Sequence, residues 1–205
     1  MATKVEKHKA KKSIAKVIAD QSVSLDGFSA GPNVGAGNPL GDGGDRLHEW
    51  YESGGDQVRD ELFSMSGALV VGRRMFDVGV ELWGNDPVFH MPVFVVTHRA
   101  SDPLVKKGGT TYFFITNGIE GALAQANAAA GDKHVAVLGG ASVIQQCINA
   151  GLVDELRIHL SHVLLRDGIR FFDHIGAECI DLKALRVIES PGATHLTFRL
   201  ANESG

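Results

Sequence analysis

Short apolar runs that alternate with helical patterns constrain the fold of this chain more than any other feature of its sequence. The runs are rich in Val, Leu, Phe and Ile and lie at residues 15–24, 67–72, 92–97, 112–116 and 134–138. Runs this short are typical of strands that are covered on both faces of a sheet. Helical segments lie between them, at residues 45–51, 56–65, 117–130 and 141–150, with a further helix expected to begin at Arg73. We therefore expect βα units built around a mainly parallel sheet.

The pattern changes after residue 150. Three strand candidates follow, at residues 153–165, 179–189 and 194–201, and no strong helix lies between them. Strands in this arrangement pair antiparallel, so we expect them at one edge of the sheet. The whole pattern predicts an α/β fold with a mixed, mostly parallel sheet, formed as a single domain by residues 15–205. The lysine-rich residues 1–14 are expected to be a flexible tail or, as the alternative, a basic arm for an anionic partner.

Composition argues against several classes of protein. The chain of 205 residues is 44% hydrophobic and 21% charged, which fits a soluble globular domain. Its formal net charge of −4 disfavours a general nucleic-acid binder, so no nucleic-acid partner is expected. No apolar run reaches the roughly 18 residues that span a bilayer, so no membrane partner is expected either. Two cysteines do not make a secreted disulfide framework, and we expect a cytoplasmic protein.

Three of the predicted strands end in residues suited to binding phosphate. Residues 139–140 are a Gly-Gly pair between a strand and a helix, where free backbone N–H groups can hold a pyrophosphate. Residues 73–74 are two arginines that open a helix, although the helix dipole disfavours cations at that end. Residues 97–99, Thr-His-Arg, follow a third strand. All three segments therefore carry groups that could face an anionic ligand.

Each of these strand ends alone has an ordinary structural explanation. A Gly-Gly pair is often only a tight turn, and two arginines can form a solvated basic turn. Together they match the rule that ligands of open α/β sheets bind beyond the carboxyl ends of the strands. The combination predicts a phosphate-rich nucleotide. The arginines favour NADP over NAD, because a guanidinium matches the extra 2′-phosphate.

Other kinds of catalytic centre find little support in the sequence. His159 and His162 are three residues apart on a predicted strand, where alternation places them on opposite faces and disfavours a shared metal ion. Cys147 lies on the apolar side of a helix and is expected in the core. Neither a zinc-deaminase motif nor a P-loop motif occurs in the chain. We therefore expect no metal site.

Four segments, taken in this order and spacing, resemble the dihydrofolate reductase-like superfamily. They are residues 24–30 (Ser-Leu-Asp-Gly-Phe-Ser-Ala), 70–76 (Val-Val-Gly-Arg-Arg-Met-Phe), 95–99 (Val-Val-Thr-His-Arg) and 137–143 (Val-Leu-Gly-Gly-Ala-Ser-Val). Within the superfamily, the chain is most similar to the RibD C-terminal domain, the reductase domain of riboflavin biosynthesis. Residues 153–165 and 170–173 extend that similarity, which covers roughly residues 17–201.

The resemblance implies a mixed, mostly parallel sheet with flanking helices, NADPH bound in a cleft, and a homodimer. It places the nicotinamide near Ala30 and Gly31. It assigns the pyrophosphate and the adenosine phosphate to Gly72, Arg73, Arg74 and Met75, and the 2′-phosphate side to Thr97, His98 and Arg99. It places Gly139, Gly140, Ala141, Ser142, Val143 and Ile144 along the span from nicotinamide to pyrophosphate, with a cis peptide between the two glycines.

The substrate is the least constrained part of this prediction. The resemblance implies hydride transfer from NADPH to a C=N or C=O carbon of a small heterocyclic substrate. The leading class is a 5-amino-6-(5-phosphoribosylamino)uracil-like pyrimidine, and dihydrofolate or another pterin is second. Dihydrofolate reductases bind the ring through an acidic residue on the first helix, and Asp45 lies nearest to that place, with Asp42 and Glu49 close by. Asp26, in the Ser-Leu-Asp-Gly motif, is the other candidate, or a turn residue that bonds its own backbone.

Two other classes of function stay open from the sequence. One is an NADPH-binding protein without turnover, and the other is an α/β domain with no nucleotide site. The deaminase half of the bifunctional riboflavin enzyme has no counterpart in the sequence, so the reductase activity alone is expected.

Overall fold

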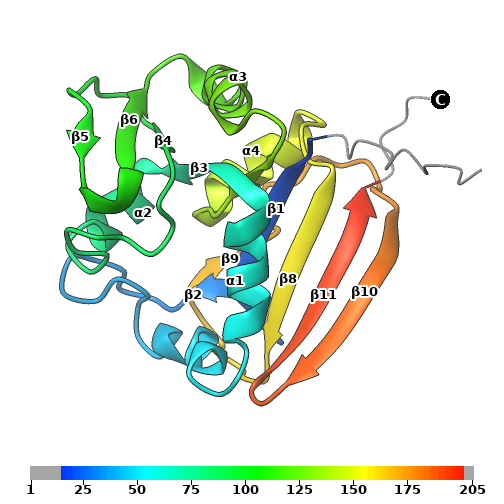
Figure 1. Ribbon diagram of the computed structural model, residues 1–205. Helices are drawn as coiled ribbons and strands as arrows, with labels where there is room; N and C mark the ends of the chain where they lie inside the picture. The colour runs from blue at the N-terminus through cyan, green and yellow to red at the C-terminus, as the bar shows by residue number, and fades with distance from the viewer. Residues whose placement is uncertain (1–14, 201–205) are drawn as a thin grey trace, which may run out of the picture.

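The computed structural model describes residues 15–200, which form a large sheet with helices on both of its faces (Figure 1). The expected tail at residues 1–14 and the end of the expected domain, residues 201–205, lie outside the described residues. Among the helices that are described, none combines the length and the apolar character needed to cross a membrane.

Within residues 15–200, nine strands make up the large sheet and two more form a small one. In chain order the large sheet contains β1 (Val17–Ser24), β3 (Ser66–Gly72), β4 (Val93–Val96), β5 (Leu104–Val105), β6 (Thr111–Ile115), β7 (His134–Val137), β8 (Glu155–Ser161), β10 (Leu182–Ser190) and β11 (Ala193–Leu200). The small sheet pairs β2 (Phe28–Ala30) with β9 (Ile169–Arg170). The helices are α1 (Asp56–Met65), α2 (Arg73–Gly79), α3 (Gly118–Ala130) and α4 (Ala141–Asn149), and short 3-10 turns are η1 (Gly44–Leu47), η2 (Glu49–Tyr51) and η3 (Lys107–Gly109).

The centre of the large sheet is parallel, as the alternating pattern predicts. Across the sheet the strand order is β10-β11-β8-β1-β7-β3-β4-β6-β5. The main antiparallel edge begins one strand later than expected, because β8 runs parallel to β1, and the antiparallel pairs at this edge are β8 with β11 and β11 with β10. The physical reason is α4, which carries the chain back along the sheet so that the next strand runs in the direction of β1. The expected mixed, mostly parallel sheet is confirmed.

Two hydrophobic layers cover the sheet, and strand alternation divides the core between them. Val17 and Ala19 of β1 pack in the layer that contains α3 and α4, whereas Ile18 packs in the layer that contains α1 and α2. Cys147 is fully buried on α4, as its position on the apolar helix face predicts. Each buried aliphatic side chain contributes roughly 1.5–3 kcal/mol. The two layers fix the strands, and the strands fix the positions of the turns at their ends.

The segment expected to be helical at residues 45–51 forms two short 3-10 turns instead. η1 begins at Gly44, so Asp45 lies inside the turn and does not cap it, and no side chain does. Glycine pairs lie directly before this segment and shortly after it. So short a stretch cannot offset the cost of nucleating an α-helix, and single 3-10 turns form. The longer helices α1, α3 and α4 agree with their expected bounds to within one residue.

A glycine-rich loop, residues 31–44, is held together by close contacts between its two arms. The Asp42 carboxylate accepts hydrogen bonds from the side-chain amides of Asn33 and Asn38, at 2.7 and 2.6 Å. The backbone of Gly31 passes so close to that of Asp42 that a Cβ at Gly31 would lie 2.1 Å from the Asp42 carbonyl oxygen. Glycine is therefore required here by space, because any side chain would separate the two arms.

A Gly31→Ala substitution is expected to destabilise the protein by about 1–3 kcal/mol, because the added methyl group would force the Asp42 carbonyl aside. Gly37→Ala is the matched control in the same loop, since nothing lies within 4 Å of an added Cβ there. That change is expected to be neutral or slightly stabilising. Chemical denaturation of the two variants measures the difference, and equal stabilities would contradict the packing of this loop.

Candidate functional site

A large cavity, about 790 Å³ in volume, lies where the expected strand ends meet. Residues at the carboxyl ends of β3, β4, β6 and β7 line one side of it, and the middle of β1 lines another. Twelve of the fifteen residues expected to bind the cofactor line this cavity: Ala30, Gly72, Arg73, Arg74, Met75, Thr97, His98, Arg99, Gly140, Ala141, Ser142 and Val143. The other three, Gly31, Gly139 and Ile144, do not line it, and Ile144 is fully buried in the core.

The turns after β3 and β7 meet at the wall of the cavity. The backbone N–H of Gly72 donates to the carbonyl oxygen of Gly139 over 2.6 Å, and the peptide between Gly139 and Gly140 is cis. A Cβ at Gly72 would lie 2.9 Å from Cγ2 of Val143, so glycine lets the start of α4 come this close. A Cβ at Gly140 would meet nothing within 4 Å. The backbone at Gly140 therefore borders open cavity.

Two helices begin at this junction, and no side chain caps either of them. Gly72 is the N-cap of α2 and Gly140 is the N-cap of α4, and among the described residues no side chain hydrogen-bonds to the start of either helix. Neither has an acidic residue in its first turn. Unpaired N–H groups and the positive end of the helix dipole attract anions. The junction is therefore suited to a diphosphate held between the two helix starts.

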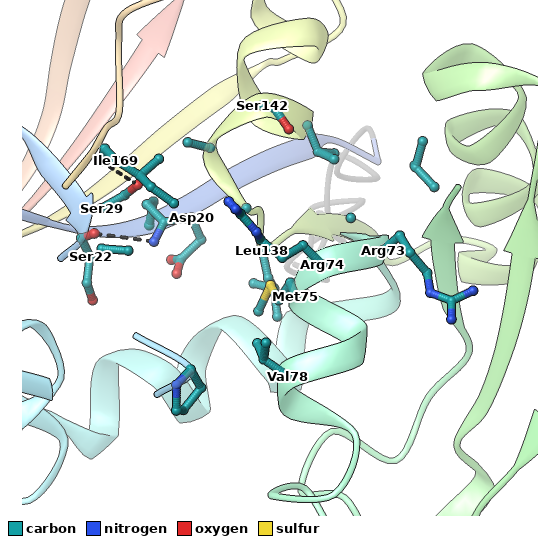
Figure 2. A pocket seen from close by; sticks show the side chains of 18 of the residues that line it. Asp20, Ser22, Ser29, Arg73, Arg74, Met75, Val78, Leu138, Ser142 and Ile169 are labelled. Carbon is teal, nitrogen blue, oxygen red and sulfur yellow. Dashed lines mark hydrogen bonds between the residues drawn. The ribbon is translucent and has the colours of Figure 1, made fainter. Parts of the chain in front are cut away.

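The arginines of this wall differ in their partners. Arg73 pairs with Asp77 one turn further along α2, with 2.7 Å between Nε and Oδ1, and its guanidinium lies 5.7 Å from the ring centre of Phe114 in β6. Arg74 extends in the opposite direction (Figure 2). Within residues 15–200, the side chains of Arg74 and Arg99 form no ion pair or hydrogen bond, while both line the cavity. The wall thus carries more cationic than anionic charge.

The other end of the cavity carries a buried carboxylate. Asp20 lies in the middle of β1 and is only 9% exposed, and its side chain borders the cavity (Figure 2). Both of its oxygens lie 3.1 Å from Nε2 of His159 in β8. Ser22, Ser29 and His48 line the same cavity. This end therefore offers a carboxylate, hydroxyls and an imidazole to a polar ligand.

Burial keeps imidazoles near this carboxylate uncharged. Loss of hydration, helped by the proximity of His159, lowers the pKa of His48 to about 4 against the opposing negative charges nearby. The same two causes lower the pKa of His195, on β11, to about 4. Burial and the charge of Asp20 raise the pKa of the Tyr51 hydroxyl. At neutral pH these three groups therefore act as hydrogen-bonding groups without charge.

Neither carboxylate expected on the substrate side lines the cavity. Asp26 accepts hydrogen bonds from the Ser24 hydroxyl at 2.5 Å and from the backbone N–H groups of Leu165 and Arg166 at 3.1 and 2.7 Å. Burial acts in the opposite direction, but these bonds lower the pKa of Asp26 overall. Asp26 thus ties the turn after β1 to the loop after β8. Asp45 is exposed in η1, because the helix that was expected to present it does not form.

The sequence pattern missed Asp20 because the residue lies within an apolar strand run. A charged residue inside such a run was the available signal, since buried charges are rare without a partner or a function.

Residues 27–31 also read Gly-x-Ser-x-Gly, the sequence of a nucleophile elbow. Ser29 lies on strand β2, however, and donates to the carbonyl of Ile169 at 3.1 Å, so it does not stand on a strand-to-helix turn.

Acid is expected to destabilise the protein through its buried imidazoles. An unfolded histidine titrates near pH 6.5, whereas folded His195 stays neutral down to about pH 4. Between these pH values protons bind the unfolded chain and not the folded one. The free energy of unfolding therefore decreases as the pH is lowered, by up to roughly 3 kcal/mol for this ring. Urea denaturation at pH 7 and pH 4.5 measures the loss. His195→Asn should show a smaller loss, and an unchanged one would contradict this origin.

Comparison with known proteins places the chain in a family. Residues 15–194 match the family model of the RibD C-terminal domain. Protein YyaP of Bacillus subtilis (strain 168) is 26% identical over 167 residues, which are 77% of this chain and 80% of YyaP. A Shewanella sp. PV-4 protein named for riboflavin biosynthesis superposes with a TM-score of 0.71 at 22% identity, covering 91% of this chain and 99% of that one.

Dihydrofolate reductase from Enterococcus faecalis, solved in complex with NADP(H), superposes with a TM-score of 0.56 at 18% identity, covering 91% of this chain and 97% of that one. The expected dihydrofolate reductase-like fold is confirmed. With the family model matched over most of its length, the chain belongs to the RibD C-terminal domain family.

Proposed function

We propose that this protein is an NADPH-dependent reductase that transfers hydride to a C=N or C=O carbon of a small heterocyclic substrate. Membership of the RibD C-terminal domain family supports an oxidoreductase of the riboflavin-biosynthesis type. The observation that carries the proposal is the polarity of the cavity. Unpaired guanidiniums and two uncapped helix starts line it together with the buried carboxylate of Asp20.

The residues on the cationic side fit NADPH. The uncapped starts of α2 and α4 suit its pyrophosphate. Arg73, Thr97 and Arg99 suit the 2′-phosphate, because Arg73 lies beside β6, next to the strand end that carries the other two. The buried side-chain oxygen of Gln21 accepts no hydrogen bond within residues 15–200 and lies beside Gly139, so it suits the nicotinamide carboxamide. NADPH bound there supplies a hydride from C4 of the nicotinamide.

Asp20 is the residue proposed to meet the substrate. Its carboxylate orients a ring N–H, and its protonated form donates a proton to the nitrogen or oxygen of the bond being reduced. His48 has a buried Nδ1 without a hydrogen-bond partner among the described residues, which gives the substrate a second contact. Trp50 and Phe63 line the cavity and exclude water from the reacting bond.

The leading substrate class is a 5-amino-6-(5-phosphoribosylamino)uracil-like pyrimidine. The N–H groups of a uracil ring suit Asp20 and Ser22, and Arg59 in the same cavity suits a ribose phosphate. Dihydrofolate or another pterin is the alternative, since its N–H groups can also pair with a carboxylate. A non-catalytic NADPH-binding protein is the alternative of another class. Assays of NADPH oxidation with the pyrimidine and with dihydrofolate in parallel separate the three.

We also propose that the protein is a cytoplasmic homodimer. β10 is the edge strand of the large sheet, and its Leu182 and Val187 are 44% and 60% exposed. An edge strand with exposed apolar side chains suits pairing with a second copy. Cys147 and Cys179 are free thiols, as expected in a reducing compartment.

Arg73→Ala is expected to weaken NADPH binding roughly 10- to 100-fold and NADH binding much less, because the 2′-phosphate loses a charge-assisted hydrogen bond. Arg59→Ala is the matched control, since Arg59 also lines the cavity and also pairs with a neighbouring carboxylate, that of Asp60. Its NADPH affinity should stay unchanged. Titrations followed by nucleotide fluorescence measure both. Equal losses of affinity for NADPH and NADH in the Arg73→Ala variant would contradict the assignment of Arg73 to the 2′-phosphate.

Asp20→Asn is expected to lower kcat about 100-fold or more, which is the usual contribution of a general acid, while NADPH affinity stays the same. Asp45→Asn tests the residue expected from the sequence and should leave kcat unchanged, because Asp45 does not line the cavity. Steady-state oxidation of NADPH with the reducible substrate measures both variants. A large loss in the Asp45 variant with none in the Asp20 variant would reverse the assignment.

A further inference from the structure

A chain of hydrogen bonds leads from Asp20 across the sheet to its far edge. Asp20 contacts Nε2 of His159 at 3.1 Å, and Nδ1 of His159 lies 2.8 Å from Nδ1 of His195. Nε2 of His195 lies 2.8 Å from the hydroxyl of Ser190. These residues belong to β1, β8, β11 and β10, which are adjacent in the sheet (Figure 1). Each hydrogen bond therefore crosses from one strand to the next.

The two imidazoles in the middle of this chain are shielded from water. His159 and His195 are 3% and 4% exposed, and the ring of Trp50 packs on both, with centroids 4.5 and 4.7 Å away. The indole N–H of Trp50 donates to the hydroxyl of Ser22, which fixes the ring in place. Ser190 at the outer end is only partly buried. The chain thus joins the cavity to the surface through two buried imidazoles.

If both imidazoles are neutral, counting donors and acceptors leaves the chain two consistent arrangements of protons. A neutral imidazole has one N–H and one acceptor nitrogen. When Asp20 is charged, His159 must donate to it from Nε2, so His195 donates from Nδ1 to His159, and Ser190 donates to His195. When Asp20 is protonated, every bond reverses and His195 donates to Ser190. The Ser190 hydroxyl then has another acceptor, the carbonyl of Ala193 at 3.3 Å.

We propose that His159, His195 and Ser190 form a proton relay. The relay carries a proton from solvent to the Asp20 carboxylate after each reduction. This inference rests on the proposed function, since hydride transfer to a C=N or C=O bond requires one proton as well. The hydride adds to carbon, the π electron pair moves to nitrogen or oxygen, and that atom takes the proton of the Asp20 carboxyl group, which becomes a carboxylate. NADPH becomes NADP⁺, and one solvent proton is consumed for each bond reduced.

The relay moves one proton at each link. Nε2 of His159 gives its proton to Asp20, Nδ1 of His195 gives its proton to Nδ1 of His159, and Ser190 gives its proton to Nε2 of His195. Ser190 takes a proton from water in the same step, so no charge stays on the chain. Both rings change tautomer once for each proton delivered, and both must rotate back before the relay can deliver another. His48 and Tyr51 also face Asp20, but both are uncharged at neutral pH because of burial.

Nitrogen NMR of the imidazoles tests the relay without a substrate. From the geometry of the hydrogen bonds we expect the proton of His159 on Nε2 and that of His195 on Nδ1. Asp20→Asn removes the charge that fixes this direction, so both rings should change tautomer population together. His162 is exposed and bonded to Thr194, and its signals are the control that should not move. A cation at either ring at pH 7, or a change confined to His159, would overturn the relay.

Kinetics test the same relay in the working enzyme. His195→Asn keeps an N–H that can donate to His159 but has no second nitrogen to accept a proton. We expect kcat to fall on the order of 100-fold, a larger solvent deuterium isotope effect, and an unchanged NADPH affinity. Ser190→Ala is the milder second variant and should show the same isotope effect, with His162→Asn as the control. Full kcat in a folded His195→Asn variant would overturn the relay, whereas loss of NADPH binding in the wild type would count against the proposed function instead.

Discussion

The hydrogen bond from the Gly72 N–H to the Gly139 carbonyl is the contact on which the rest of the site depends. It joins the turns that follow two neighbouring parallel strands, β3 and β7. Val70 and Val137 are paired in register, so Gly72 lies level with Gly139, and α2 and α4 start side by side. Because Gly72 has no side chain, the start of α4 can approach it, and two sets of free N–H groups converge on one cavity. The proposed anion site is thus a consequence of strand register.

The buried carboxylate of Asp20 gives the cavity its second property. Burying a carboxylate destabilises a fold unless hydrogen bonds offset the lost hydration, and here His159 provides both a contact and a connection to the next strand. In the proposed function, the cations on one side of the cavity bind a nucleotide and this carboxylate on another side binds a polar ring. A nicotinamide between them would present its reacting carbon to a ring that Asp20 holds. Strand β1, which lies inside the sheet between β8 and β7, therefore also carries the carboxylate proposed to orient the substrate.

Local patterns in the sequence were sufficient for most of the elements and for most of the residues expected to line the cavity. Strand ends such as Gly72 and Gly140 carry their signal in a few adjacent residues, so their meeting at one edge followed from the parallel sheet alone. For Asp20 the only local signal was a charge inside an apolar run, because its partner His159 lies 139 residues further along the chain. Asp45 was misplaced because its expected position depended on a helix that glycines prevent. The direction of β8 is set by the path of the chain through α4, which crosses from β7 to β8. The hydrophobic periodicity of the sequence does not show where such a crossover ends.

The most direct test of this account is a crystal structure of the protein grown with saturating NADPH. The account predicts the pyrophosphate between the starts of α2 and α4, the 2′-phosphate against Arg73 and Arg99, and the nicotinamide C4 facing the space next to Asp20. A nucleotide bound on another face of the sheet, or a cavity without nucleotide at saturating concentration, would contradict it.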